Sequence, residues 1–324
     1  MVLTCHQTAL AGEILYIAVL GLYGISTMFV YFTNFEFGML SMPNWPGFCG
    51  GIHGMSLSIG ALLLPQIIIL LRETFSDFHI NPGTIFFCLA ILKIISSAPW
   101  LPVVSPDCQH KALINEGTHT VRNQDIRKMH VLRSCTMWLM AIGSFAAYVP
   151  PLALLAVQEP LLHALWSENH APISLLSALL MMSFLIGRVL CLFYSDNMGM
   201  KRVWITALLA QIVFLGCLGF IMTQRNDSSM KYVGMAVLSA YYVIFPAFKS
   251  TMAGFGHEMF GSQYRLLAVS VMSVMSGVAG LVGPVAIDTI YNHFNSYSWF
   301  FFGSAGLSLI GGVAILAVQP QHES

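Results

Sequence analysis

Nine apolar runs, most of about 20 residues, divide the sequence and restrict what it can fold into. They lie at about 13–33, 47–71, 83–104, 135–157, 172–194, 203–222, 232–250, 265–290 and 298–318. A helix needs roughly 20 apolar residues to cross a bilayer. Only 9% of the 324 residues are charged, whereas soluble domains carry about 25%. We therefore expect an all-α, polytopic membrane protein with about nine helices that cross the lipid bilayer.

One long polar stretch separates the first three runs from the last six. Residues 105–134 are rich in His, Asn and charge, and they show no apolar periodicity. This pattern predicts a partial N-terminal bundle of three spans over 1–104 and a linker over 105–134. Residues 135–324 are then expected to form a six-helix bundle.

The basic residues between the runs or near their ends are unevenly distributed between the two expected sides of the membrane. With nine spans, one side collects nine of them: Lys111, Arg122, Arg127, Lys128, Arg133, Lys201, Arg202, Lys249 and Arg265. The other side collects three: Arg72, Arg225 and Lys231. The basic side is normally cytoplasmic, which predicts a cytoplasmic linker and C-terminus and an external N-terminus. The plasma membrane is the expected location, with an organelle membrane as the alternative. The net charge of zero gives no reason to expect a nucleic-acid partner.

An arginine interrupts the apolar run 172–194. On a helix, Arg188 shares a face with six residues that make this face more polar than the rest: Ser174, Ser177, Met181, Phe184, Cys191 and Ser195. Such a face is expected to line the bundle interior or a water-filled cavity. The alternative is that Arg188, about 10 Å from the helix end at 1.5 Å per residue, extends its side chain to the interface.

Two further ionisable residues fall inside predicted spans. Lys93 lies at the middle of 83–104, so its charge requires a partner or water. His53 lies in 47–71 and is either a hydrogen-bonded packing residue or part of a proton relay.

Catalytic and metal-binding patterns are missing from the sequence. His257-Glu258 is followed by Met259-Phe260-Gly261, so no HExxH pair forms, and there is no GxSxG or CxxC. We expect neither an enzyme nor a metal or cofactor.

The stretch GRVLCLFYSDNMGMKR (187–202) resembles the conserved cytoplasmic loop of the major facilitator superfamily. Asp196, Gly199, Lys201 and Arg202 match its pattern, while Cys191 stands where a glycine is usual. The resemblance implies that the loop joins the second and third helices of a six-helix half. It also implies that Asp196 and the basic pair form gating salt bridges there.

Two other stretches resemble one branch of that family, the oxalate/formate antiporters and monocarboxylate transporters. They are MPNWPGFCGGIHGMSLSIGALLLP (42–65) and GSQYRLLAVSVMSVMSGVAGLVGP (261–284). The branch implies that Arg188 binds a substrate carboxylate, and we expect Ser177, Met181 and Phe184 on the same face to bind the substrate with it. The oxalate transporter's second buried cation, in the eleventh helix, is replaced here by Met275-Ser276. One retained cation favours a monocarboxylate.

The resemblance implies a secondary transporter of a small organic anion that works by alternating access, with a proton or a counter-anion as coupling ion. The chain would start at the fourth helix of that fold, so we expect the first three-helix repeat to be missing. A truncated product, an incomplete gene model and a divergent transporter are the alternatives. The competing functions are a truncated, non-transporting membrane protein and a carrier for amino acids or other neutral solutes.

Overall fold

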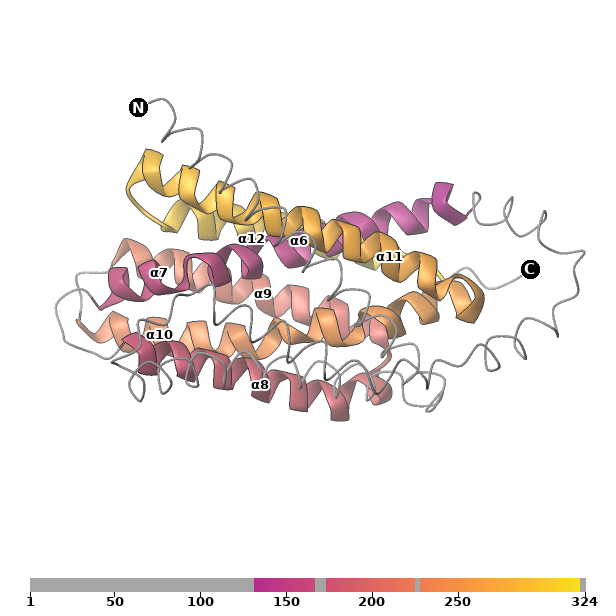
Figure 1. Ribbon diagram of the computed structural model, residues 1–324, viewed down its shortest axis with the longest axis horizontal. Coiled ribbons are helices and arrows are strands. Elements are labelled where there is room, and N and C mark those ends of the chain that lie inside the picture. Colours follow the sequence, from indigo (N-terminus) through magenta and orange to yellow (C-terminus); the bar gives the residue numbers. More distant parts are fainter. Residues whose placement is uncertain (1–130, 167–172, 225–227, 321–324) are drawn as a thin grey trace, which may run out of the picture.

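The computed structural model describes residues 131–166, 173–224 and 228–320, and in these ranges the regular structure is entirely helical (Figure 1). The helices are α6 (Cys135–Ala156), α7 (Gln158–Leu165), α8 (Ile173–Met198), α9 (Met200–Thr223), α10 (Ser228–Ile244), α11 (Pro246–Phe294) and α12 (Ser298–Ala317). The three spans predicted before residue 105, with His53 and Lys93, lie outside the described residues. So does the predicted linker up to residue 130.

Six helical segments in the described part of the chain are long and apolar enough to cross a membrane. They are Cys135–Ala156, Leu175–Ser195, Met200–Thr223, Met230–Gly261, Tyr264–Phe294 and Ser298–Ala317. Each corresponds to one of the last six predicted runs. The prediction of an all-helical, multi-pass membrane protein is therefore confirmed for these residues.

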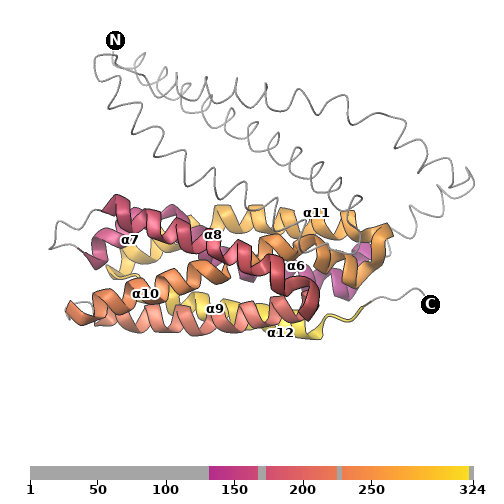
Figure 2. The same cartoon turned by 90° about the horizontal axis from the view of Figure 1, so that it is seen from below.

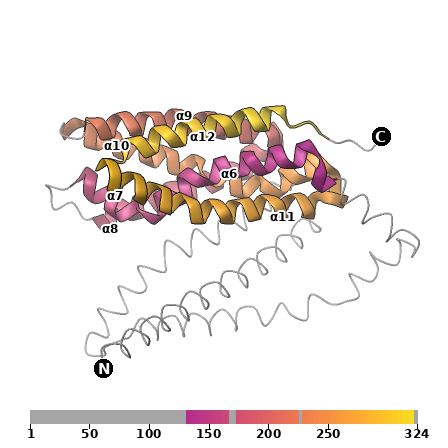
Figure 3. The same ribbon diagram turned by 90° about the horizontal axis from the view of Figure 1, so that it is seen from above.

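The six segments run side by side as one elongated bundle (Figure 1). Two further views show α9 with α12 on one side and α8 with α11 on the other (Figures 2 and 3). The start of α6 and the segment after α12 lie at the same end, where the Thr136 hydroxyl donates to the carbonyl of Gln319 at 3.4 Å. An even number of crossings brings the chain back to the end where α6 begins.

The connection between α8 and α9 is shorter than predicted. We expected a polar turn over 195–202, but α8 continues to Met198 and α9 begins at Met200. Only Gly199 lies between them, with φ of 82°, a left-handed conformation that favours glycine. One residue in this left-handed conformation is enough to reverse the chain. Residues Ser195 to Met198 are therefore not needed for the turn and remain part of helix α8.

The fourth described span also differs from its predicted bounds. We expected it to end at residue 250, but the helix continues to Gly261, where φ is 71° and the chain turns back. This span consists of α10 and the first part of α11, interrupted at Phe245. The interruption follows from Pro246, which has no N–H to donate to the preceding turn.

The longer span corrects one assignment of charge. Lys249, which we counted on the cytoplasmic side because it lies at the end of the predicted run 232–250, is instead twelve residues from the end of the segment Met230–Gly261. The predicted excess of basic residues on that side falls accordingly from nine against three to eight against three.

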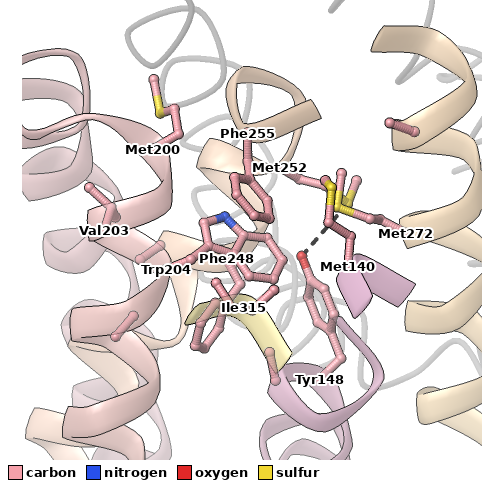
Figure 4. Close-up of a cluster of buried hydrophobic side chains, with 14 of the residues drawn as sticks. Met140, Tyr148, Met200, Val203, Trp204, Phe248, Met252, Phe255, Met272 and Ile315 are labelled. Atoms are coloured by element: carbon pink, nitrogen blue, oxygen red, sulfur yellow. Dashed lines mark hydrogen bonds between the residues drawn. The ribbon is translucent and has the colours of Figure 1, made fainter. Parts of the chain in front are cut away.

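Two clusters of buried apolar side chains hold the bundle together. In the first, Trp204 stacks on Phe255 at 5.0 Å between ring centroids and meets Phe248 edge-on at 5.3 Å (Figure 4). The second contains Leu161, Leu180, Leu215, Tyr241 and Phe301. Phe184 of α8 packs against both clusters, which places it at their junction.

Candidate functional site

Helix α8 has a buried face and an exposed face. Arg188 and Ser195 are buried on the first, and Ser177, Met181, Phe184 and Cys191 are half-buried there. The opposite face is exposed along its length: Leu175, Leu179, Met182, Ile186, Leu190 and Phe193. The face that carries Arg188 therefore points into the protein, as its polar composition predicted. The side chains of Ser174 and Asp196 lie outside the described residues.

Arg188 is held deep in the bundle. Its side chain is 4% exposed, and its guanidinium carbon lies 4.8 Å from the centroid of the Phe184 ring. At this distance the cation is attracted to the face of the ring. Since a buried charge is costly in an apolar environment, the site requires groups that stabilise it, and Phe184 is one of them.

The backbone beside Arg188 approaches a neighbouring helix closely. A Cβ atom at Gly187 would overlap the carbonyl group of Val243 on α10. No side chain separates the two backbones at this point, so glycine is required. The contact brings Arg188 next to the interruption between α10 and α11 at Phe245.

Aromatic rings surround this interruption. Phe184 and Phe245 lie 5.4 Å apart, and Tyr148 of α6 lies 6.3 Å from Phe245 and 6.2 Å from Phe248. The Tyr148 hydroxyl points to the sulfur of Met252 at 4.0 Å (Figure 4). The rings give the site apolar walls from three helices.

Hydroxyl groups are also buried on these helices. The hydroxyls of Ser144 on α6, Tyr241 on α10 and Ser250 on α11 have no hydrogen-bond partner among the described residues. A buried polar atom normally finds a partner in the protein or in water. These three hydroxyls are therefore available to a bound polar molecule or to water.

Lys249 is the second basic residue of this region. It follows Phe245 by one helical turn and is half-buried, and it lies close enough to Arg188 for the two positive charges to repel each other. We did not predict it as a site residue, because it lies at the end of the predicted run 232–250, where a lysine is expected at the membrane surface.

Ser177, one of the predicted substrate ligands, takes part in a network between helices. Gln158 of α7 donates from Nε2 to its hydroxyl at 2.7 Å, and the Tyr242 hydroxyl of α10 donates to Gln158 Oε1 at 3.1 Å. The network joins α7, α8 and α10. Met181, another predicted ligand, packs against the second apolar cluster.

The predicted gating residues lie at the end of the bundle where α9 begins. The Lys201 ammonium donates to the carbonyls of Leu316 at 3.1 Å and Val318 at 2.6 Å, and thus binds the C-terminal end of α12. Arg202 is exposed. Gly199 supplies the turn, and Asp196 lies in the last turn of α8.

Glu258 is a residue of this end that sequence reasoning missed. Its Oε2 accepts hydrogen bonds from the backbone N–H groups of Met200 at 2.7 Å and Lys201 at 3.2 Å. A carboxylate at a helix N-terminus satisfies free N–H groups and is favoured by the helix dipole. Glu258 therefore ties the first part of α11 to α9, and only the fold could reveal this contact.

In the described ranges, no three His, Cys, Asp or Glu side chains are grouped closely enough to hold a metal ion. No family model matches the chain, and no curated protein matches its sequence.

The fold and the site define a class: a polytopic α-helical membrane protein with a buried basic region between α8 and the α10–α11 span. The resemblance to the major facilitator superfamily remains a prediction from the motif at 187–202.

Proposed function

We propose that the protein is a secondary transporter of a small organic anion, a monocarboxylate, that works by alternating access. The observation that supports this most is the burial of Arg188 against Phe184, the residue that packs against both apolar clusters. An arginine guanidinium can bind a carboxylate through two parallel hydrogen bonds. Phe184 would orient the guanidinium, and Ser177 and Met181 lie on the same face of α8.

The end of the bundle that contains Gly199 is the proposed cytoplasmic gate. Lys201 and Glu258 connect α9 to α12 and to α11 there, and Asp196 and Arg202 are close in sequence. These bonds would stabilise one state of an alternating-access cycle. In this proposal the C-terminus is cytoplasmic, and the protein is in the plasma membrane.

Uptake of labelled solutes into liposomes that contain the full chain tests the substrate class. We expect saturable uptake of pyruvate or lactate and no uptake of lactamide, their neutral relative. Uptake of leucine without uptake of any carboxylate would instead support a neutral-solute carrier. No uptake of any of these solutes by correctly inserted protein would support a non-transporting membrane protein.

The coupling ion can be identified in the same liposomes. A proton-coupled carrier takes up pyruvate faster when the outside is more acidic than the inside. An anion exchanger is instead accelerated by unlabelled pyruvate inside and does not respond to the pH gradient.

A further inference from the structure

Lys249 occupies an unusual position for a lysine. It lies within the membrane-length segment Met230–Gly261, twelve residues before the turn at Gly261, which is about 18 Å along a helix at 1.5 Å per residue. That length exceeds the reach of a lysine side chain, so Lys249 does not simply extend to the end of the bundle. A charge at this depth in a membrane protein marks a site that binds ions or polar solutes more often than a packing position.

Two contacts between α8 and the α10–α11 span place Lys249 in the same region of the bundle as Arg188. Helices α8 and α10 touch at Gly187 and Val243, and Phe184 contacts Phe245 with 5.4 Å between ring centroids. Residues four apart on a helix lie on the same face, so Lys249 follows Phe245 on the face that meets α8. The guanidinium of Arg188 lies over the ring of Phe184, with its carbon 4.8 Å from the ring centroid.

The two charges influence each other across this contact. Arg188 and Lys249 are close enough for electrostatic repulsion, and both lie in apolar segments where charges are weakly screened. A carboxylate between them would be attracted by both and would reduce their repulsion. The hydroxyl of Ser250, next to Lys249, is buried and has no partner among the described residues.

We propose that Lys249 is a second substrate-binding cation, so that one carboxylate-bearing substrate is bound by Arg188 from α8 and by Lys249 from α11. This inference rests on the proposed function and adds a specificity residue to it: both cations contact the same single carboxylate, so the substrate class is unchanged. It also connects binding to the interrupted span, because Lys249 belongs to the first turn after Pro246. The substrate would thereby hold α8 and the start of α11 together.

The test compares two variants of Lys249 with a matched control. Lys249→Met removes the charge and keeps the length, while Lys249→Arg keeps the charge. Lys231→Met makes the same change 18 residues earlier, near the opposite end of the same span. The dissociation constant of pyruvate is measured for the full chain in liposomes, together with the unfolding temperature without ligand.

We expect Lys249→Met to weaken pyruvate binding about tenfold or more, the usual cost of losing one charge-assisted bond. Lys249→Arg should stay within about threefold of the wild type, and Lys231→Met should bind normally. A lysine with a purely structural role would change the unfolding temperature in Lys249→Met but leave the affinity of the folded protein unchanged.

The outcomes separate this inference from the function on which it rests. If Arg188→Ala loses pyruvate binding while Lys249→Met keeps wild-type affinity, Lys249 is not part of the site and the proposed function stands. If the wild type binds no carboxylate, both proposals are wrong.

Discussion

Arg188 brings a positive charge into a helix whose outer face is apolar. Ile186 and Leu190 on that outer face are exposed, while Arg188 itself is buried. The contact with Phe184 offsets part of the cost of burial, since cation–π contacts contribute about 0.5–2 kcal/mol. The proposed binding site would give this charge a role that an apolar residue at the same position could not have.

Gly187 is predicted to be intolerant of any side chain. In Gly187→Ala the new methyl group would overlap the Val243 carbonyl, which is backbone and cannot rotate away, so α8 and α10 must separate. We expect a loss of about 1–3 kcal/mol, as for other overpacked positions, seen as a lower unfolding temperature. Gly216→Ala is the control, because a Cβ atom there has open space. Equal unfolding temperatures for the two variants would contradict the close approach.

At this scale the sequence reveals some site residues and hides others. Arg188 is conspicuous because a charge interrupts a long apolar run. Lys249 is inconspicuous because it lies beside other polar residues, and its depth depends on where the helix ends. Glu258 and Gln158 act through contacts with residues 19 or more positions away, and no local pattern predicts such contacts.

At the scale of the elements, the N-terminus of α9 is capped by a carboxylate from another helix, that of Glu258. Glu258→Ala leaves the N–H groups of Met200 and Lys201 without this acceptor, so α9 should lose stability at its first turn. We expect a loss of about 1 kcal/mol, the usual effect of removing an N-cap, in thermal unfolding of the full chain. The control is His257→Ala, which changes an exposed neighbouring residue. If His257→Ala lowers stability as much as Glu258→Ala does, the loss does not come from the capping contact.

Lys201 performs the complementary role at the end of α12. Lys201→Met removes the ammonium group that binds the carbonyls of Leu316 and Val318, where a helix carries partial negative charge. We expect the segment after α12 to loosen, with faster hydrogen exchange at residues 315–319. Arg202→Met removes an exposed charge from the same turn and should leave that exchange unchanged. Equal hydrogen-exchange rates at residues 315–319 in the two variants would show that the Lys201 contact does not stabilise this segment.

The elements themselves follow largely from hydropathy. Six runs predict six spans, because crossing a bilayer demands length and apolarity more than any specific residue. Residues 251–260 were wrongly assigned to a loop, since His257 and Glu258 lower the hydropathy there. The helix continues because Phe248, Met252 and Phe255 are buried on its inner side. Helix α7 was missed because its eight residues are too few to cross a membrane.

At the scale of the whole molecule, the bundle has two distinct ends. The α8–α9 connection, the start of α6 and the end of α12 lie at one end, and the α11–α12 connection lies at the other (Figure 1). The exposed apolar side chains of α8, α9, α11 and α12 suit a surface that faces lipid.

Cysteine labelling tests this topology. In a background without native cysteines, Asn197→Cys and Gln319→Cys should react only with reagents that enter the cytoplasm. Asn295→Cys should react with impermeant reagents added outside sealed cells, because α11 crosses the membrane between the two ends. External labelling of all three positions would contradict both the span count and the proposed orientation.

The affinity of Arg188 variants for pyruvate tests the central claim most directly. At matched expression, Arg188→Lys keeps the charge but loses the two-bond geometry, and we predict about tenfold weaker binding, equivalent to about 1.4 kcal/mol. Arg188→Ala should insert normally in the membrane and bind no pyruvate. Wild-type affinity in Arg188→Ala would contradict the account and remove the basis for an organic-anion carrier.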